Sequence, residues 1–179
     1  GTALARELSA RGEEWVLAGR QLPKGLDPAC YFPLQDVEPL SFDALFTLYD
    51  TSSLPSVVIN TIGLLHDINF MPELWVEEVN PKWLCDSLLA NAWPHLALGA
   101  CLSRRMTPDA SLWLCSLSDL AGSLTANEAG SRYSYRMSKA ALNMGARTLA
   151  LEWRERFPGA GVVTVHPGSM DTPMNQTFL

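Results

Sequence analysis

Three short apolar runs, separated by segments with helical spacing, constrain the fold of this chain more than any other feature. They are residues 55–63 (PSVVINTIG), 111–118 (SLWLCSLS) and 161–168 (GVVTVHPG). Each run is apolar at neighbouring positions rather than at alternate ones, which is typical of strands buried on both faces. Because helical segments lie between them, the pattern predicts a parallel sheet covered by helices on both faces. We therefore expect one doubly wound α/β domain over residues 1–179.

Weaker patterns extend the same alternation along the chain. The other expected helices are residues 1–12, 41–49 (capped by Ser41), 81–106 (interrupted at Pro94) and 132–156; the other expected strands are residues 14–20 and 30–37, and residues 64–80 are expected to be a loop. No internal repeat or low-complexity linker divides the sequence, so a single domain is expected.

Charge and cysteine usage exclude several classes of protein. The net charge of −6 and the pI near 5.0 argue against a nucleic-acid or anionic-membrane surface. No apolar run reaches the length of a membrane-spanning helix. The four cysteines form no C-x-x-C pair and the three histidines have no ligand partners in register, so we expect free thiols, no metal and a reducing, cytoplasmic setting.

Small and polar residues follow the expected strands. They are Arg20, Asp36 and residues 60–63, 116–122 and 166–172. In open parallel sheets, ligands bind outside the carboxyl ends of the strands, where the backbone can approach a flat ligand. These segments therefore predict a cofactor groove.

Tyr135 and Lys139 are the candidate catalytic pair. Residues four apart on a helix share a face, whereas Tyr133 lies on another face. A nearby ammonium favours the phenolate, so we expect Lys139 to lower the pKa of Tyr135. A tyrosine tuned in this way can act as a general acid or base toward a carbonyl or alcohol oxygen. The alternative is a tyrosine and a lysine that share a helix surface without a chemical role.

The motif Y-x-x-S-K at residues 135–139 resembles the short-chain dehydrogenase/reductase family, and the resemblance extends over essentially the whole chain. The segments SLSDLAGS and YSYRMSKAALN are most similar to the C-factor-like branch of carbonyl reductases. The resemblance implies a Rossmann-like fold and hydride transfer between a nicotinamide and a carbonyl or alcohol substrate. It also implies that Tyr135 is the general acid or base and that Lys139 orients the ribose.

The same resemblance assigns cofactor-binding residues. Residues 59–63 resemble the family's N-N-A-G segment, residues 36–37 resemble its adenine-contacting D-V pair, and residues 165–174 resemble the segment beside the nicotinamide. Gly1 resembles the last glycine of the phosphate-binding loop. The implied cofactor-binding residues are Gly1, Arg20, Asp36, Val37, Asn60, Thr61, Gly63, Lys139, Pro167, Gly168 and Thr172.

Asn91 resembles the family's catalytic asparagine. Pro94 has no N–H, so the carbonyl of Ala90 lacks its helical partner there. The break offers a binding point for the water of a proton relay, which Asn91 is expected to anchor; a kinked helix without a role is the alternative.

The serine that holds the substrate oxygen is expected at Ser118. The family's usual interval before Tyr135 falls on Gly122, the S-x-x-G spacing falls on Asp119, and Ser116 is a further candidate. An ionised Asp119 would oppose the negative charge that develops on the substrate oxygen during reduction. We therefore expect Asp119 to be turned away from the site.

Both ends of the chain depart from the family pattern. The family's first and last strands have no counterpart here, and of its phosphate-binding loop only the last glycine, Gly1, does. We therefore expect an incomplete domain that is a piece of a longer chain and binds a dinucleotide weakly or not at all. Arg20 with no acid at residues 18–20 favours NADP over NAD.

The expected partners are a small carbonyl or alcohol substrate and, by analogy with the family, a second copy in a homodimer or homotetramer. Two alternatives stay open. The first alternative to an enzyme is a non-enzymatic relative used in signalling or binding. The second is an inactive truncated product.

Overall fold

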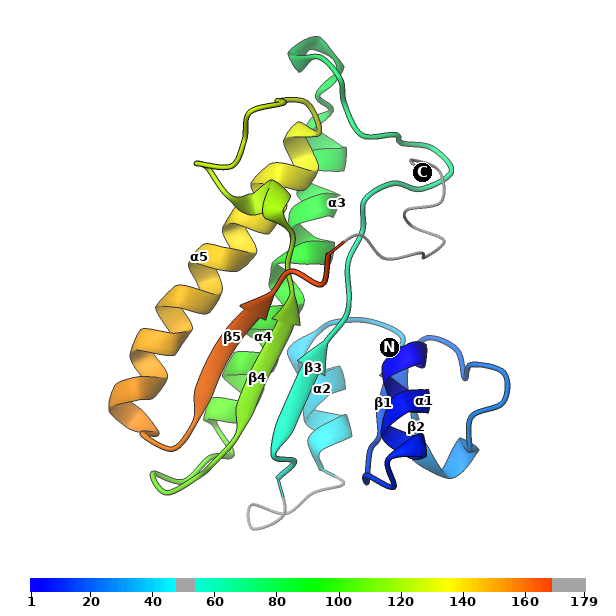
Figure 1. The fold of residues 1–179 in the computed structure, drawn as a ribbon, viewed down its shortest axis with the longest axis vertical. Coiled ribbons are helices and arrows are strands. Elements are labelled where there is room, and N and C mark those ends of the chain that lie inside the picture. Colours follow the sequence, from blue (N-terminus) through cyan, green and yellow to red (C-terminus); the bar gives the residue numbers. More distant parts are fainter. Residues whose placement is uncertain (48–53, 169–179) are drawn as a thin grey trace.

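The structure, a computed structural model that describes residues 1–47 and 54–168, contains two parallel sheets (Figure 1). Strand β1 (Leu17–Gly19) pairs with β2 (Tyr31–Pro33). Strands β3 (Val57–Asn60), β4 (Trp113–Leu117) and β5 (Gly161–Val165) form the second sheet in that order. All pairings are parallel, which confirms the α/β fold and each strand that the apolar runs predicted.

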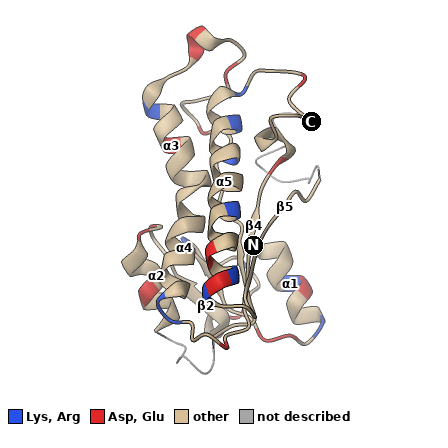
Figure 2. Ribbon diagram, turned by 90° about the vertical axis from the view of Figure 1, so that its left-hand side faces the viewer, with Lys and Arg blue, Asp and Glu red and all other residues tan. Residues whose placement is uncertain are grey.

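The helices lie on two sides of the strands (Figures 1 and 2). On one side are α2 (Pro39–Phe46), α3 (Pro81–Asn91), α4 (Trp93–Ser103) and α5 (Tyr133–Arg156). Helix α1 (Thr2–Ala10) lies on the other side. Single 3₁₀ turns occur at Pro28–Cys30, Val76–Glu78 and Leu120–Gly122. Charged residues lie along α1, α3 and α5, whereas β4 and β5 carry none (Figure 2).

Proline sets two of the helix boundaries. The stretch over residues 81–106 is interrupted as predicted, because Pro94 is accommodated in the first turn of α4, where a missing N–H costs no hydrogen bond. The expected cap at Ser41 is wrong. Helix α2 begins two residues earlier because Pro39 starts it after the extended Glu38.

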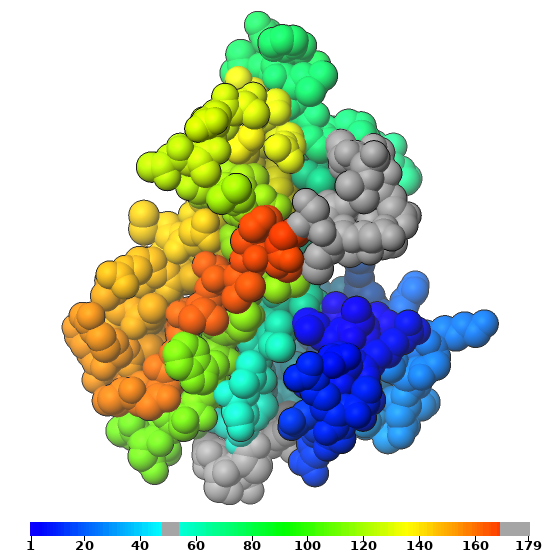
Figure 3. Space-filling model, viewed as in Figure 1, coloured from blue at the N-terminus to red at the C-terminus, as the bar shows by residue number. Residues whose placement is uncertain are grey.

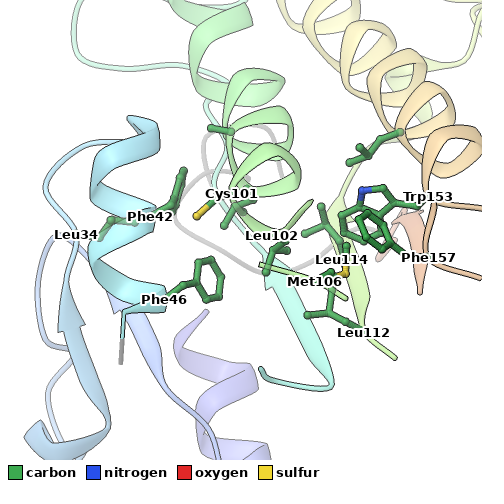
Figure 4. Close-up of a cluster of buried hydrophobic side chains, with 13 residues drawn as sticks. Leu34, Phe42, Phe46, Cys101, Leu102, Met106, Leu112, Leu114, Trp153 and Phe157 are labelled. Atoms are coloured by element: carbon green, nitrogen blue, oxygen red, sulfur yellow. The ribbon is translucent and has the colours of Figure 1, made fainter. Parts of the chain in front are cut away.

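The main core lies between the helical layer and the strands (Figure 4). It contains Leu34, Phe42, Phe46, Ala97, Leu98, Cys101, Leu102, Met106, Leu112, Leu114, Leu149, Trp153 and Phe157. Trp153 is fully buried and donates from Nε1 to the Ser103 hydroxyl over 2.8 Å, which satisfies its polar atom. The core therefore ties α5 to α4 and fixes the helix that carries Tyr135.

A groove separates the two sheets. Its volume is about 910 Å³, and apolar side chains such as Leu4, Leu17 and Val57 line it. In Figure 3 the α1 segment (blue) and the β3 segment (cyan) lie side by side on this face. Among the described residues no strand lies between β1 and β3, so the two sheets are separate.

The second face of the β3–β5 sheet differs from the prediction of helices on both faces. Val57, Ile59 and Trp113 on this sheet are 40–50% exposed. The reason is positional: α1, the one described helix on that side, lies beside the groove and not over these strands. Within residues 1–47 and 54–168, no helix is long and apolar enough to cross a membrane.

Candidate active site

Tyr135 and Lys139 lie together at the carboxyl end of β4. They are on the buried face of α5, with 8% and 5% of their surfaces exposed, and the Lys139 Nζ atom lies 5.7 Å from the centre of the Tyr135 ring. Lys139 Nζ donates a hydrogen bond to the carbonyl oxygen of Leu117, the last residue of β4, over 3.0 Å. Tyr133 points elsewhere and is 37% exposed. The two residues therefore share one site, as their spacing predicted.

The electrostatic environment of Tyr135 is opposite to the one expected. Burial raises the pKa of its phenol, and the charge of Asp119 and its hydrogen bond raise it further. Burial also lowers the pKa of the Lys139 ammonium, and the charge of Asp119 opposes this change. The prediction that Lys139 lowers the pKa of Tyr135 is wrong, because burial and the Asp119 carboxylate together raise this pKa. The phenol stays protonated at neutral pH.

Asp119 is not turned away from the site. Its Oδ2 accepts a hydrogen bond from the Tyr135 hydroxyl over 3.2 Å, and its Oδ1 accepts from the backbone N–H of Ala121 over 2.7 Å. The Ser118 hydroxyl donates instead to Oδ1 of Asn143 over 2.7 Å. The position that the S-x-x-G spacing gave to Asp119 is therefore the one in contact with Tyr135.

Asn91 is fully buried and its amide is used within the protein. Its Oδ1 accepts from the backbone N–H of Leu64 over 2.7 Å, and its Nδ2 donates to the Leu64 carbonyl and the Ser138 hydroxyl over 2.8 and 2.9 Å. Asn91 thus fixes the segment after β3 against α3 and α5. Its assignment as the anchor of a relay water stays a prediction.

Glu73, which the sequence reasoning missed, fixes the start of α5. Its carboxylate is 3% exposed and accepts hydrogen bonds from both the N–H and the hydroxyl of Ser134. The Glu73 carbonyl accepts from the N–H of Arg132, which, like Ser131, has a left-handed backbone conformation. A carboxylate at a helix N-terminus is a known stabilising arrangement, but Glu73 lies 61 residues from Ser134, so no local pattern marks it.

We expect Glu73→Ala to lower the free energy of unfolding by about 2 kcal/mol, because two buried donors of Ser134 lose a charged acceptor. Glu73→Gln keeps one acceptor oxygen and should lose less. Chemical denaturation measures both, and Glu77→Ala, an exposed acid on the same segment, is the matched control. Equal stabilities for Glu73→Ala and Glu77→Ala would show that Glu73 does not hold α5.

Gly122 allows the 3₁₀ turn after β4 to approach α5 closely. A Cβ atom there would lie 2.7 Å from the backbone carbonyl carbon of Lys139 and 2.8 Å from its oxygen. Real Cβ atoms do not come so near to backbone, so only glycine fits here. Gly122 therefore packs directly against α5, and Asp119 three residues earlier accepts a hydrogen bond from Tyr135.

The residues expected to hold a cofactor lie along the carboxyl ends of the strands. A Cβ on Gly63 would lie 3.2 Å from Asn91 Oδ1 and 3.7 Å from Lys139 Nζ, so the absence of a side chain keeps space open above the lysine. A Cβ on Gly1 would lie 3.4 Å from Thr61 Oγ1, so the start of α1 is next to the segment after β3. These contacts bring the N-terminus of α1 and the segment after β3 to one edge.

The other expected cofactor residues are placed less centrally. Arg20 is exposed directly after β1, and the exposed Asp36 accepts from the N–H of Glu38 and the Ser41 hydroxyl. The half-buried Val37 packs against the main core. Pro167 and Gly168 are exposed after β5, with Gly168 at a φ of +78°, and Thr172 lies outside the described residues.

Asn60, Ser116 and His95 form a buried network beside this edge. Asn60 Nδ2 donates to the Ser116 hydroxyl over 3.3 Å, and His95 Nδ1 lies 2.7 Å from the same oxygen. Ser116 is therefore engaged by His95 and Asn60 and is no candidate for the substrate oxygen. Within the described part of the chain, no group of three His, Cys, Asp or Glu side chains could hold a metal ion.

Comparisons with known proteins agree on the fold. No protein-family model matches the sequence. A stretch of 53 residues is 49% identical to C-signal of Myxococcus xanthus, and the match covers 30% of this chain and 31% of C-signal.

Among solved structures, a protein from Burkholderia multivorans, assigned as a short-chain dehydrogenase/reductase and solved with bound NADP, is 24% identical, with a TM-score of 0.77 over 97% of this chain and 76% of its own. The carbonyl reductase Sniffer of D. melanogaster is 22% identical, with a TM-score of 0.66 over 80% of this chain and 61% of its own. The chain therefore has the Rossmann-like fold of short-chain dehydrogenases/reductases.

Proposed function

We propose that this chain is an NADP-dependent oxidoreductase of the short-chain dehydrogenase/reductase type that acts on a carbonyl or alcohol substrate. One observation carries the proposal: α5 holds Tyr135 and Lys139 buried at the carboxyl end of β4, with the Lys139 ammonium 5.7 Å from the centre of the Tyr135 ring. Two further findings support the proposal: the chain shares its fold with short-chain dehydrogenases/reductases, and one solved structure of that fold contains bound NADP.

Each residue has a distinct role in the proposed reaction. A bound nicotinamide would exchange a hydride with the carbonyl carbon of the substrate. Tyr135, which its raised pKa keeps protonated, would donate its hydrogen to the substrate oxygen in reduction, or receive one in oxidation. Lys139 would stabilise the phenolate that reduction leaves behind and bind the ribose. Gly63, Thr61 and Asn60 would line the cofactor edge.

Arg20 is proposed to select NADP by binding its 2′-phosphate. We expect Arg20→Glu to lower the NADPH:NADH preference by about tenfold or more, because an acid repels the phosphate and accepts from a ribose hydroxyl. The measurement is consumption of each cofactor with a panel of aldehydes, ketones and quinones, with both cofactors at millimolar concentration.

Lys24→Glu makes the same charge change at a nearby exposed position and is the control. If the two variants shift the preference equally, Arg20 has no specific role. If no carbonyl compound is reduced with either cofactor, the proposed function fails.

A homodimer or homotetramer is also proposed. Met137 and Met144 on the outer face of α5 are 50% and 68% exposed, which supports self-association through that helix. The cytoplasmic location stays a prediction.

A non-enzymatic role in signalling or binding is the second candidate. The identity with C-signal over 53 residues favours it, as does the Asp119 carboxylate beside Tyr135, which opposes reduction of a simple carbonyl. The same panel of carbonyl compounds discriminates the two candidates, since only an enzyme consumes NADPH in a manner that depends on the substrate.

A further inference from the structure

Asp119 places a fixed hydrogen-bond acceptor beside the acid–base tyrosine. The Asp119 side chain is held by two contacts: Oδ1 accepts from the Ala121 N–H, and Oδ2 accepts from the Tyr135 hydroxyl. The residue is half-buried, so Oδ2 stays within reach of a ligand at Tyr135. A substrate oxygen that contacts Tyr135 therefore also meets this carboxylate.

The hydroxyls of the two serines that precede Asp119 on β4 and directly after it are already engaged. The Ser118 hydroxyl is bound to Asn143, and the Ser116 oxygen is engaged by His95 and Asn60. A carbonyl oxygen and a carboxylate oxygen can only accept hydrogen bonds, so a simple ketone at Tyr135 meets an acceptor with no hydrogen between them. The repulsion grows as negative charge develops on the substrate oxygen.

We infer that the site takes carbonyl compounds with a hydroxyl group on the carbon next to the carbonyl, and the vicinal diols formed from them. This inference rests on the proposed function. The neighbouring hydroxyl donates to Asp119 Oδ2 and replaces Tyr135 there, and the Tyr135 hydrogen is then free for the carbonyl oxygen. The carboxylate keeps its hydrogen bond, and the tyrosine gains a new acceptor.

The step balances. The carbonyl carbon would gain a hydride from a bound reduced nicotinamide and the oxygen would gain the proton of Tyr135, so the C=O double bond would become a C–O single bond while one C–H and one O–H bond form. The cofactor is oxidised, the hydroxycarbonyl compound is reduced to a vicinal diol, and the phenolate regains a proton from solvent.

The neighbouring donor is a neutral hydroxyl rather than an ammonium. A carboxylate binds either group, but the buried Lys139 ammonium lies beside the same tyrosine and repels a second cation.

The test uses hydroxyacetone and butanone, which have the same skeleton and differ by a hydroxyl in place of a methyl group. Binding is followed without cofactor by NMR of labelled tyrosine rings, with the Tyr135 signal assigned as the one missing from Tyr135→Phe. Reduction with NADPH is measured separately. Asp119→Asn and Asp119→Ser remove the carboxylate, and Asp109→Asn removes an exposed one elsewhere.

In the wild type and in Asp109→Asn, we expect hydroxyacetone to shift the Tyr135 signal at concentrations at least tenfold lower than butanone does. In both Asp119 variants, we expect the two ketones to shift the signal at equal concentrations. Equal binding in the wild type, a preference that survives in the Asp119 variants, or no shift with either ketone overturns the inference. Reduction of both ketones at equal rates overturns it but leaves the proposed function standing. A hydroxyacetone preference in binding without any NADPH consumption supports the inference and rejects the proposed reaction.

Discussion

Tyr135→Phe is expected to lower kcat/KM of carbonyl reduction by about 10³-fold, within the range that a general acid contributes. The change removes the hydroxyl that donates to Asp119, and leaves the ring that lies beside the Lys139 ammonium and packs with Leu65 and Ala121. Because the hydroxyl is the proton donor and not a packing group, the folded structure and cofactor binding should change little. Steady-state kinetics with NADPH, together with a thermal melt, measure both expectations.

Tyr133→Phe is the matched control for this prediction. It removes a hydroxyl from the same turn of α5, but from an exposed side chain outside the site. We expect it to keep wild-type kinetics. A Tyr135→Phe variant that turns over as fast as Tyr133→Phe would remove Tyr135 from the proposed chemistry.

Acidification from pH 7 to about pH 4 is expected to lower the free energy of unfolding by about 3 kcal/mol through the titration of His95 alone. Burial lowers the pKa of this histidine from its ordinary value of 6.5 to about 4, and its Nε2 has no hydrogen-bond partner among the described residues. Between these two values the unfolded chain binds a proton that the folded chain does not, so the free energy of unfolding falls as the pH drops through this window. The stability is fully present above about pH 6.5 and is lost progressively toward pH 4.

His95→Gln isolates this effect, because glutamine can still bond to Ser116 and does not titrate in this range. The free energy of unfolding, measured by urea denaturation at several pH values from 7 to 4.5, should fall more steeply for the wild type than for His95→Gln. Parallel curves would mean that His95 titrates normally in the folded protein and is not buried as described.

The fold was predictable because its strongest signals are local. The apolar runs that became β3, β4 and β5 carry contiguous apolar side chains in the sequence itself, and Pro94 marks the break between α3 and α4. The exposed second face of the β3–β5 sheet was not predictable. An apolar strand pattern indicates that a strand can be buried, but it does not indicate whether a helix covers that strand.

The candidate site was predictable in part. The spacing of Tyr135 and Lys139 was enough to place both on one face of α5, because helical geometry is fixed. The pKa of Tyr135 was not, because it depends on burial and on Asp119, sixteen residues away. The S-x-x-G spacing indicated Asp119, but Ser118 was expected instead because a carboxylate repels a substrate oxygen that gains negative charge. Glu73 could not have been found, since its contact with Ser134 is made by the tertiary fold.

The central claim is that hydride passes between a nicotinamide and a carbonyl carbon held at Tyr135. The most direct measurement gives the chain NADPH that carries deuterium at the transferable position of the nicotinamide, together with a reducible hydroxyketone, and analyses the product by mass spectrometry and NMR. The account predicts a diol with deuterium on the former carbonyl carbon, formed by the wild type and by Tyr133→Phe but not by Tyr135→Phe. A product without deuterium on that carbon, or the same yield from Tyr135→Phe, would contradict it.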